Sequence, residues 1–151
     1  MLENLKSWAA QENLDPLGQW DDYDYLRFCR ARKFQLVEIK SMFKKFITYR
    51  IDHNVDSLLQ NFSFPDLEEV RKFFPHCYHG IDKTGRPVRI ERMGTLDTES
   101  LQKVVTYSKL EEYIRYAYEV QMKLRLPICS ELAGRRIETI VTIQDLTGAS
   151  M

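Results

Sequence analysis

The sequence is poor in the residues that mark unfolded, fibrous or disulfide-stapled chains. It contains 6 glycines and 5 prolines among 151 residues, too few for a collagen-like or low-complexity chain. Its three cysteines, Cys29, Cys77 and Cys129, are odd in number and widely spaced, which excludes a disulfide framework and favours a reducing compartment. It has neither an apolar run long enough to span a bilayer nor a secretion signal at its amino terminus, so we expect a cytoplasmic protein.

The sequence also lacks an excess of charge of either sign. Lysine plus arginine and aspartate plus glutamate both number 22, so the formal net charge is zero. Nucleic-acid-binding domains are usually basic, and we therefore expect no nucleic acid partner. With 44% hydrophobic residues and a length of 151, the chain has the size of one compact domain that can bury a substantial core.

The charges are nevertheless distributed unevenly at the amino-terminal end. Residues 1–26 carry six acidic residues and one lysine, whereas residues 27–50 carry eight basic residues and one glutamate. One interpretation is a pair of solvated helices whose charges partly satisfy each other. The other is a basic face that steers the protein toward an anionic membrane.

The spacing of apolar residues predicts helices through the first half of the chain and again near its end. Asp21 or Asp22 is a suitable N-cap for a helix that contains Tyr25 and Phe28. Further helices are predicted over 36–51 from an apolar stripe, after Pro65, after Asp97, and from Ser108 to about Leu126, with Pro127 and Gly134 bracketing the end of the last one.

Two segments have the pattern of strands. Cys77–Ile81 and Pro87–Met93 flank the turn 82–86 and predict a hairpin. Ile137–Leu146 is β-branched and apolar on both alternating faces, which is typical of a central strand that is covered on both sides. Three strands cannot cover such a strand, and the sequence ends five residues later. We therefore expect the chain to be cut off inside a domain.

The groups that could carry out chemistry are few. His76, Cys77 and His79 are metal-ligand types, but His53 and Cys129 are isolated and no second ligand pair has suitable spacing, so we expect no metal site. No glycine-rich phosphate loop and no oriented nucleophile is evident either. The sequence therefore predicts neither an enzyme nor a cofactor.

Four segments occur in the order of four motifs of one known family. Residues 24–34 (DYLRFCRARKF) are similar to L-x-R-F-x-R-A-R-K-F, and residues 74–88 (FPHCYHGIDKTGRPV) are similar to the hairpin motif Y-P-x-x-Y-H-x-x-D-K-x-G-R-P-V. Residues 126–130 (LPICS) and 142–148 (TIQDLTG) are similar to L-P-A-C-S and T-I-x-D-L-x-G. Through these motifs the chain resembles the CRAL-TRIO family of Sec-fourteen-type phosphatidylinositol/phosphatidylcholine transfer proteins. Together these matches cover essentially the whole chain.

This resemblance implies an α/β (α+β) fold, with an N-terminal helical lobe at 1–64 and the incomplete start of a mixed-sheet lipid-binding lobe at 65–151. The family pocket holds one phospholipid and exchanges it transiently at a membrane surface, so the expected ligand is a phospholipid and the expected protein is peripherally membrane-associated. Among the family's phosphatidylcholine headgroup positions, Tyr78 and Thr142 match. Arg89 stands where tyrosine is usual and Ile140 where serine is usual, which removes a hydroxyl donor.

Arg89 has two interpretations of its own. It could make a charge-assisted contact with a phosphate, or it could face solvent, because it alternates with Val88 and Ile90.

A different class of function also stays open for the whole chain. The Ile137–Leu146 strand could pair through a free edge with another chain, which would make the protein an interaction module with no lipid of its own.

Overall fold

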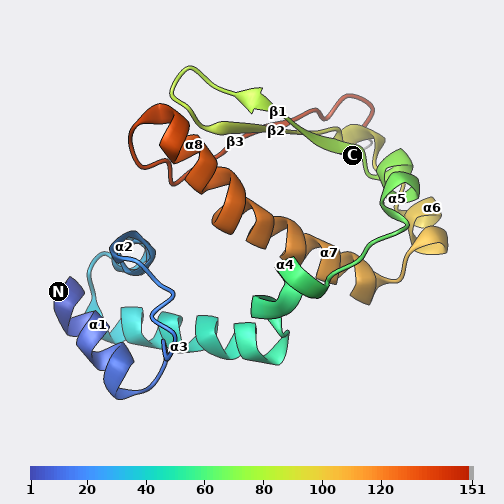
Figure 1. Ribbon diagram of the computed structural model, residues 1–151. Helices are drawn as coiled ribbons and strands as arrows, with labels where there is room; N and C mark the ends of the chain where they lie inside the picture. Colours follow the sequence, from blue (N-terminus) through green and yellow to red (C-terminus); the bar gives the residue numbers. More distant parts are fainter. Residues whose placement is uncertain (150–151) are drawn as a thin grey trace. The chain divides into compact units, whose positions relative to one another are not determined.

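The computed structural model describes residues 1–149 and divides into two compact units. The first unit is Met1–Asp56, and the second begins at Ser57. Helices form the first unit, and the second combines helices with a three-stranded mixed sheet (Figure 1). This arrangement confirms the predicted α/β class. A lobe boundary at residue 64 stays a prediction.

Three helices pack around an aromatic core in the first unit: α1 (Leu2–Gln11), α2 (Asp22–Ala31) and α3 (Leu36–Asp52). Asp21 caps α2 as predicted, because its carboxylate accepts from the Asp24 amide while the Asp24 side chain accepts from the Asp21 amide. Phe43 of α3 is fully buried and contacts the rings of Tyr25 and Phe28, with centroid distances of 5.2 and 5.1 Å. The predicted apolar stripe of α3 therefore forms the centre of this core.

Opposite charges meet across the helices of this unit. Lys6 Nζ lies 2.7 Å from Asp22 Oδ1, and Lys44 Nζ lies 2.7 Å from Glu12 Oε2. Only the pair of Lys44 and Glu12 joins the basic segment to the acidic one, and it supports the interpretation in which the two segments partly satisfy each other. Each ion pair is solvent-exposed, so its contribution to stability is only about 0–1 kcal/mol.

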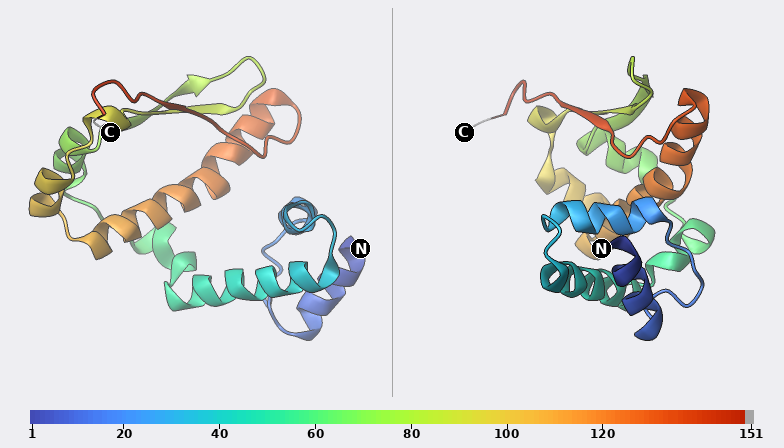
Figure 2. Two further views of the ribbon diagram at one scale, coloured as in Figure 1. Left: turned by 180° about the vertical axis from the view of Figure 1, so that it is seen from behind. Right: turned by 90° about the vertical axis from the view of Figure 1, so that its left-hand side faces the viewer.

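The second unit contains the predicted hairpin and a third strand beside it. The helices α5 (Leu67–Phe73) and α6 (Thr98–Val104) lie near one end of the sheet, whereas α4 (Leu58–Asn61) packs against the long helix α7 (Tyr107–Val120) (Figure 2). Strands β1 (His76–Ile81) and β2 (Pro87–Glu91) are antiparallel, and β3 (Val141–Gln144) runs parallel to β2. The strand order is β1-β2-β3, so β2 is the central strand.

The prediction that the long helix stops at about Leu126 is wrong, but Gly134, one of the two residues expected to bracket its end, does end it. Helix α7 (Tyr107–Val120) continues through a π-helical turn (Gln121–Arg125) into α8 (Leu126–Ala133), which ends at the left-handed Gly134. Pro127 lies in the first turn of α8, where its missing N–H group is tolerated, and the preceding π-helical turn accommodates it. None of the helices within residues 1–149 has both the length and the apolar character needed to cross a bilayer.

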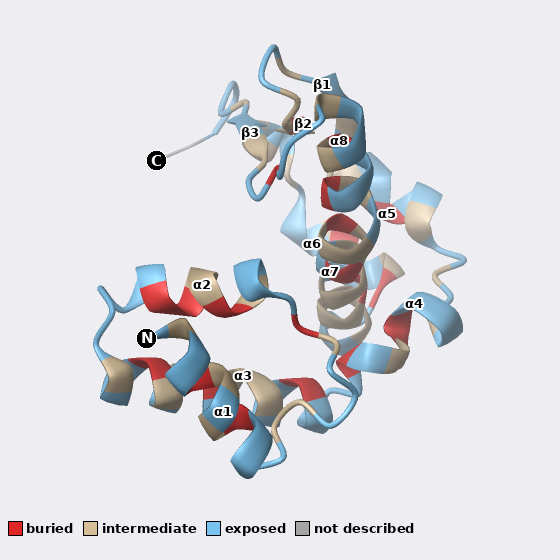
Figure 3. Ribbon diagram, turned by 60° about the vertical axis from the view of Figure 1, so that its left-hand side comes forward, coloured by how far each residue is buried: buried red, intermediate tan, exposed pale blue. Residues whose placement is uncertain are grey.

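The prediction of a central, doubly covered strand over Ile137–Leu146 is also wrong. Only Val141–Gln144 form a strand, and that strand lies at the edge of the sheet. Thr142, Ile143 and Gln144 are exposed, as the pale ribbon of β3 shows (Figure 3). Among the described residues β3 has a strand neighbour on one side only, and its Ile143 is 50% exposed.

A close contact fixes the segment that follows β3. The Gly94 amide donates to the Asp145 carbonyl at 2.9 Å. A Cβ atom at Gly94 would lie 2.3 Å from the Thr147 carbonyl oxygen, closer than real contacts allow. Glycine at this position therefore lets the two loops pass each other.

Candidate functional site

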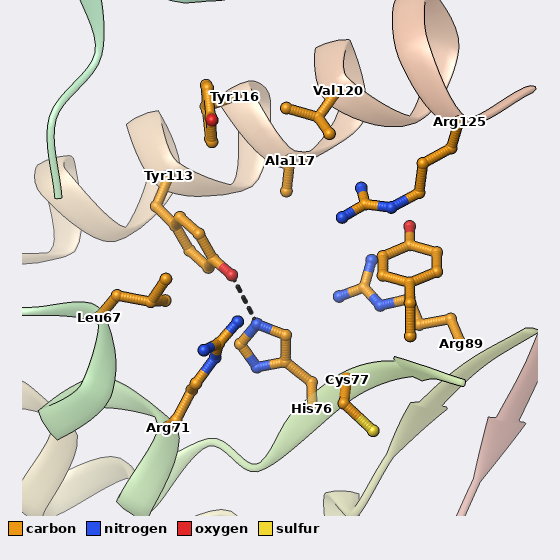
Figure 4. Close-up of a pocket in the computed structure, with 11 residues that line it drawn as sticks. Leu67, Arg71, His76, Cys77, Arg89, Tyr113, Tyr116, Ala117, Val120 and Arg125 are labelled. Carbon is orange, nitrogen blue, oxygen red and sulfur yellow. Dashed lines mark hydrogen bonds between the residues drawn. The ribbon is translucent and has the colours of Figure 1, made fainter. Parts of the chain in front are cut away.

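A cavity of about 550 Å³ lies between the sheet and helix α7 in the second unit. This volume falls in the range of about 300–1,000 Å³ that is typical of small-molecule sites. Arg71, Arg89 and Arg125 point into it from α5, β2 and the π-helical turn (Figure 4). The remaining lining residues are aromatic, apolar or hydrogen-bonding: Leu67, His76, Cys77, Tyr78, Tyr113, Tyr116, Ala117 and Val120. The cavity is therefore basic at several points and apolar along α7.

The three predicted site residues stand in one row across the sheet. Tyr78 of β1 pairs with Arg89 of β2, and Arg89 pairs with Thr142 of β3. Directly paired residues on neighbouring strands project from the same face, so these three side chains share the face that lines the cavity. Tyr78 and Arg89 line the cavity itself, whereas Thr142 is exposed at the sheet edge and does not.

A second polar row follows on the same face and holds Arg89 in place. His76, Glu91 and Gln144 are paired across the three strands. Glu91 Oε1 lies 2.7 Å from Arg89 Nη2, and Glu91 Oε2 accepts from Gln144 Nε2 at 3.1 Å. The Nε–H of Arg89 is buried and has no hydrogen-bond partner. The Arg89 guanidinium on this face is thus held by Glu91 through Nη2, while its Nε–H group lacks a hydrogen-bond acceptor.

The opposite face of the sheet carries an apolar row. Cys77, Ile90 and Ile143 are paired across the strands, and Ile143 is 50% exposed. The Cys77 thiol points away from the cavity (Figure 4). Sheets usually bury their apolar face, and this sheet instead covers its polar face with α7. The polar face is therefore the one that the fold encloses.

The π-helical turn brings two side chains onto Tyr78. The Tyr78 hydroxyl donates to Gln121 Oε1 at 2.9 Å, and the Gln121 side chain is buried. The guanidinium carbon of Arg125 lies 3.9 Å from the centroid of the Tyr78 ring, a cation–π distance. Residues four apart, Gln121 and Arg125, thus both contact one tyrosine across the cavity wall.

His76 is held by hydrogen bonds at both ring nitrogens. Its Nδ1 lies 2.8 Å from the Phe74 carbonyl oxygen, which can only accept, so Nδ1 carries a proton. Its Nε2 lies 2.6 Å from the Tyr113 hydroxyl and accepts from it when the ring is neutral. Burial lowers the pKa of His76, and the positive charges of Arg89 and Arg71 act in the same direction. Within residues 1–149 no group of three or more potential metal ligands converges.

The arginines also act on Tyr113, which reaches the cavity from α7. Burial raises the pKa of Tyr113, while the charges of Arg71, Arg89 and Arg125 oppose that shift. Two of these arginines have a carboxylate beside them, since Arg71 Nη1 lies 2.7 Å from Glu68 Oε1 and Arg89 pairs with Glu91. The lining residues themselves include no carboxylate. The cavity is therefore an environment suited to an anion.

Several of these residues were not predicted from the sequence as site residues. His76 could have been found, because it lies two residues before Tyr78 in a strand and therefore shares its face. Arg71, Tyr113 and Arg125 lie on helices distant in sequence, and no local pattern distinguishes them from other polar helix positions.

Comparisons with known proteins give a consistent set of relatives, although no family model matches the chain. The chain is 36% identical over 150 residues to the phosphatidylinositol/phosphatidylcholine transfer protein SFH7 of Arabidopsis thaliana, covering 99% of this chain and 27% of that protein. It is 42% identical over 135 residues to SFH4 of the same plant, covering 87% of this chain and 22% of the relative. It is 37% identical over 152 residues to the SEC14 cytosolic factor of Kluyveromyces lactis, covering 99% of this chain and 50% of the relative. The chain thus spans between about a quarter and a half of the length of these relatives.

Proposed function

We propose that this chain, which belongs to the CRAL-TRIO family of phosphatidylinositol/phosphatidylcholine transfer proteins, binds one phospholipid and carries it between membranes. The observation that supports the proposal most directly is the cavity of about 550 Å³, which combines basic groups and tyrosine hydroxyls with the apolar side chains of Leu67, Ala117 and Val120. Binding of this kind is non-covalent and needs no cofactor. Apolar burial contributes about 0.8 kcal/mol per CH₂ group, and the polar groups select the headgroup.

We assign the headgroup to the polar face of the sheet. Tyr78 and Arg89 line the cavity there, and Thr142 continues their row to the edge strand. Leu67, Ala117 and Val120 offer apolar contacts for the part of the lipid next to the headgroup. The lipid is released unchanged, because the proposal includes no chemical step.

Exchange at a membrane requires a surface that docks there, and the basic segment 27–50 is a candidate. Arg32 and Lys33 are exposed between α2 and α3, and the neighbouring Phe34 and Val37 are 50% and 80% exposed. Basic residues beside exposed apolar ones favour transient, peripheral binding to an anionic, cytoplasmic membrane face.

A transfer assay tests this proposal. Donor vesicles that contain a fluorescent phospholipid are mixed with acceptor vesicles, with and without the chain. We expect the chain to accelerate transfer and Ala117→Phe, which fills the cavity, to abolish the acceleration. Ile114→Phe, at an exposed position of the same helix, is the matched control and should transfer like the wild type. Circular dichroism confirms that both variants fold. A chain that neither extracts nor transfers lipid would refute the proposal.

The exposed edge of β3 supports a second candidate, self-association. Ile143 and Leu146 are 50% and 62% exposed beside this edge, and an edge strand with apolar neighbours can pair with another copy. Sedimentation velocity should then show dimers whose population increases with concentration and disappears with Ile143→Lys. Ile128→Lys changes an equally exposed residue of α8 and should leave the dimers intact. A monomer at all concentrations rejects this candidate.

A further inference from the structure

The positive charge of the cavity is only partly neutralised, because Arg71 and Arg89 each have a carboxylate beside them and Arg125 is stacked on a tyrosine ring. Three guanidinium groups reach the cavity from three separate elements, and the lining residues include no carboxylate that could face a choline group. Glu91, the nearest acidic side chain of the sheet, has both oxygens engaged, one by Arg89 and the other by Gln144.

We propose that this cavity selects a phosphate monoester and rejects a choline headgroup, so that its preferred lipid ligand is an anionic phospholipid with a terminal phosphate. That the phosphate belongs to a lipid rests on the proposed function. That the cavity binds a phosphate at all rests on the side chains that line it. A terminal phosphate presents three strong acceptor oxygens and close to two negative charges, which guanidinium groups match in charge and in geometry.

Arg89 supplies the first contact. Its Nη2 is fixed by Glu91, so the guanidinium has a defined orientation, and its buried Nε–H lacks an acceptor. An unsatisfied buried donor is unfavourable, and a phosphate oxygen relieves it once the guanidinium turns this N–H into the cavity. A choline group has no acceptor to offer at this place.

Arg125 supplies the second contact from the opposite wall. Its guanidinium lies over the Tyr78 ring, 3.9 Å from the ring centroid. The contact with the ring leaves the N–H groups at the guanidinium edge available for hydrogen bonds. Arg89 thus approaches the cavity from the sheet and Arg125 from the helix, so the two guanidinium groups can bind one anion from opposite sides.

The hydrogen-bonded pair of His76 and Tyr113 supplies the third contact with the phosphate. Tyr113 donates to the neutral His76 ring, and its oxygen keeps a lone pair. When His76 takes up a proton, its Nε2–H becomes the donor and the Tyr113 hydroxyl is free to donate to the phosphate. The charged groups that face this pair are Arg71 of α5, Arg89 and Glu91 of β2, and Arg125 of the π-helical turn. Anion binding and protonation of His76 therefore favour each other.

Two sets of ligands test separately whether the cavity binds a phosphate group and whether that phosphate comes from a lipid. Isothermal titration calorimetry on the full chain uses glycerol 3-phosphate, a phosphate monoester, and glycerophosphocholine, the phosphodiester of phosphatidylcholine, as soluble probes. Native mass spectrometry then measures uptake from vesicles that contain equal amounts of phosphatidic acid and phosphatidylcholine. We expect glycerol 3-phosphate to bind and glycerophosphocholine not to bind, and we expect phosphatidic acid to be loaded in preference to phosphatidylcholine.

Two variants remove the proposed contacts, and one is a control. Arg125→Gln changes no residue of the sheet, although it removes the contact with the Tyr78 ring. The double variant Arg89→Gln with Glu91→Gln removes both partners of the buried ion pair, so that no unpaired charge remains to prevent folding. Each should weaken glycerol 3-phosphate binding about tenfold or more. Lys83→Gln removes an exposed positive charge from the hairpin turn and should bind like the wild type.

Each outcome decides the inference. Equal loading of phosphatidylcholine and phosphatidic acid overturns it and leaves the lipid proposal intact. Binding of glycerol 3-phosphate without uptake of any lipid supports the phosphate site and rejects the lipid function. Equal weakening by Lys83→Gln overturns the site, because the effect would then be one of overall charge. No binding of either class overturns both proposals.

Discussion

The guanidinium of Arg125 lies 3.9 Å from the centre of the Tyr78 ring, and the Tyr78 hydroxyl donates to Gln121. Tyr78 therefore joins the sheet to the helix by two separable contacts. Tyr78→Phe removes the hydrogen bond and leaves the buried Gln121 oxygen unsatisfied, which we expect to lower the free energy of unfolding by about 1–2 kcal/mol. Tyr78→Leu also removes the ring, and we expect a further loss of about 0.5–2 kcal/mol.

Urea unfolding followed by circular dichroism measures both losses. Tyr107→Phe, at a tyrosine that is 75% exposed, is the control and should not change the midpoint. Equal midpoints for Tyr78→Phe and Tyr78→Leu would show that the ring does not support Arg125.

Gly94 allows a second prediction, which separates steric contact from backbone strain. Gly94→Ala places a Cβ atom 2.3 Å from the Thr147 carbonyl oxygen, so the loop after β3 must move. We expect destabilisation of about 2–4 kcal/mol. Gly80→Ala has no atom within 4 Å of its new Cβ but a φ of +61°, so it should lose only the smaller penalty of about 1–2 kcal/mol for a left-handed alanine. Thermal unfolding of both variants tests the order. A larger effect at Gly80 would contradict the close approach.

His76 makes stability depend on pH. Its pKa is lowered in the fold by burial, and Arg89 and Arg71 lower it further, so the unfolded chain binds protons more readily than the folded one. The free energy of unfolding should therefore decrease as the pH falls below about 6.5, the usual value for histidine. Urea midpoints measured between about pH 7.5 and pH 5 follow this loss.

His76→Gln should remove that part of the pH dependence. His53 is exposed, and His53→Gln should retain the wild-type pH profile. If the His76 variant keeps the full pH dependence, another group is responsible for it.

The basic segment predicts salt-dependent membrane binding. Each exposed basic residue contributes about 1 kcal/mol near an anionic surface, so Arg32→Gln with Lys33→Gln should weaken binding to phosphatidylserine vesicles roughly 30-fold. Co-sedimentation with vesicles at low and high salt measures this. The control changes two exposed lysines elsewhere, Lys83→Gln with Lys103→Gln, and should reduce binding less. An equal reduction would assign the effect to net charge instead of to this segment.

The parts of the fold that depend on short-range signals were predictable. Asp21 and Asp24 mark the start of α2, and alternating residues around the turn at 82–86 mark the hairpin. The predictions that failed depend on tertiary context. Pro127 indicated a helix end, but the π-helical turn before it allows the helix to continue. The apolar pattern of Ile137–Leu146 indicated burial, but burial depends on neighbours that the pattern does not reveal.

The candidate site, too, contains residues that the sequence predicted and contacts that it did not. Tyr78, Arg89 and Thr142 were named from motifs, and the register of the sheet places them in one row. The motifs did not show that Arg89 would be fixed by Glu91, nor that Arg125 would reach Tyr78 from a helix more than forty residues away in the chain. Such contacts follow from packing between elements, and no local sequence pattern encodes them.

Native mass spectrometry of the chain after incubation with phospholipid vesicles, followed by analysis of the released lipid, tests the central claim most directly. The account predicts a monomer that carries one phospholipid, and it predicts that Ala117→Phe, which fills the cavity, stays empty. A folded wild-type chain that remains empty after incubation, as a monomer or a dimer, would contradict it.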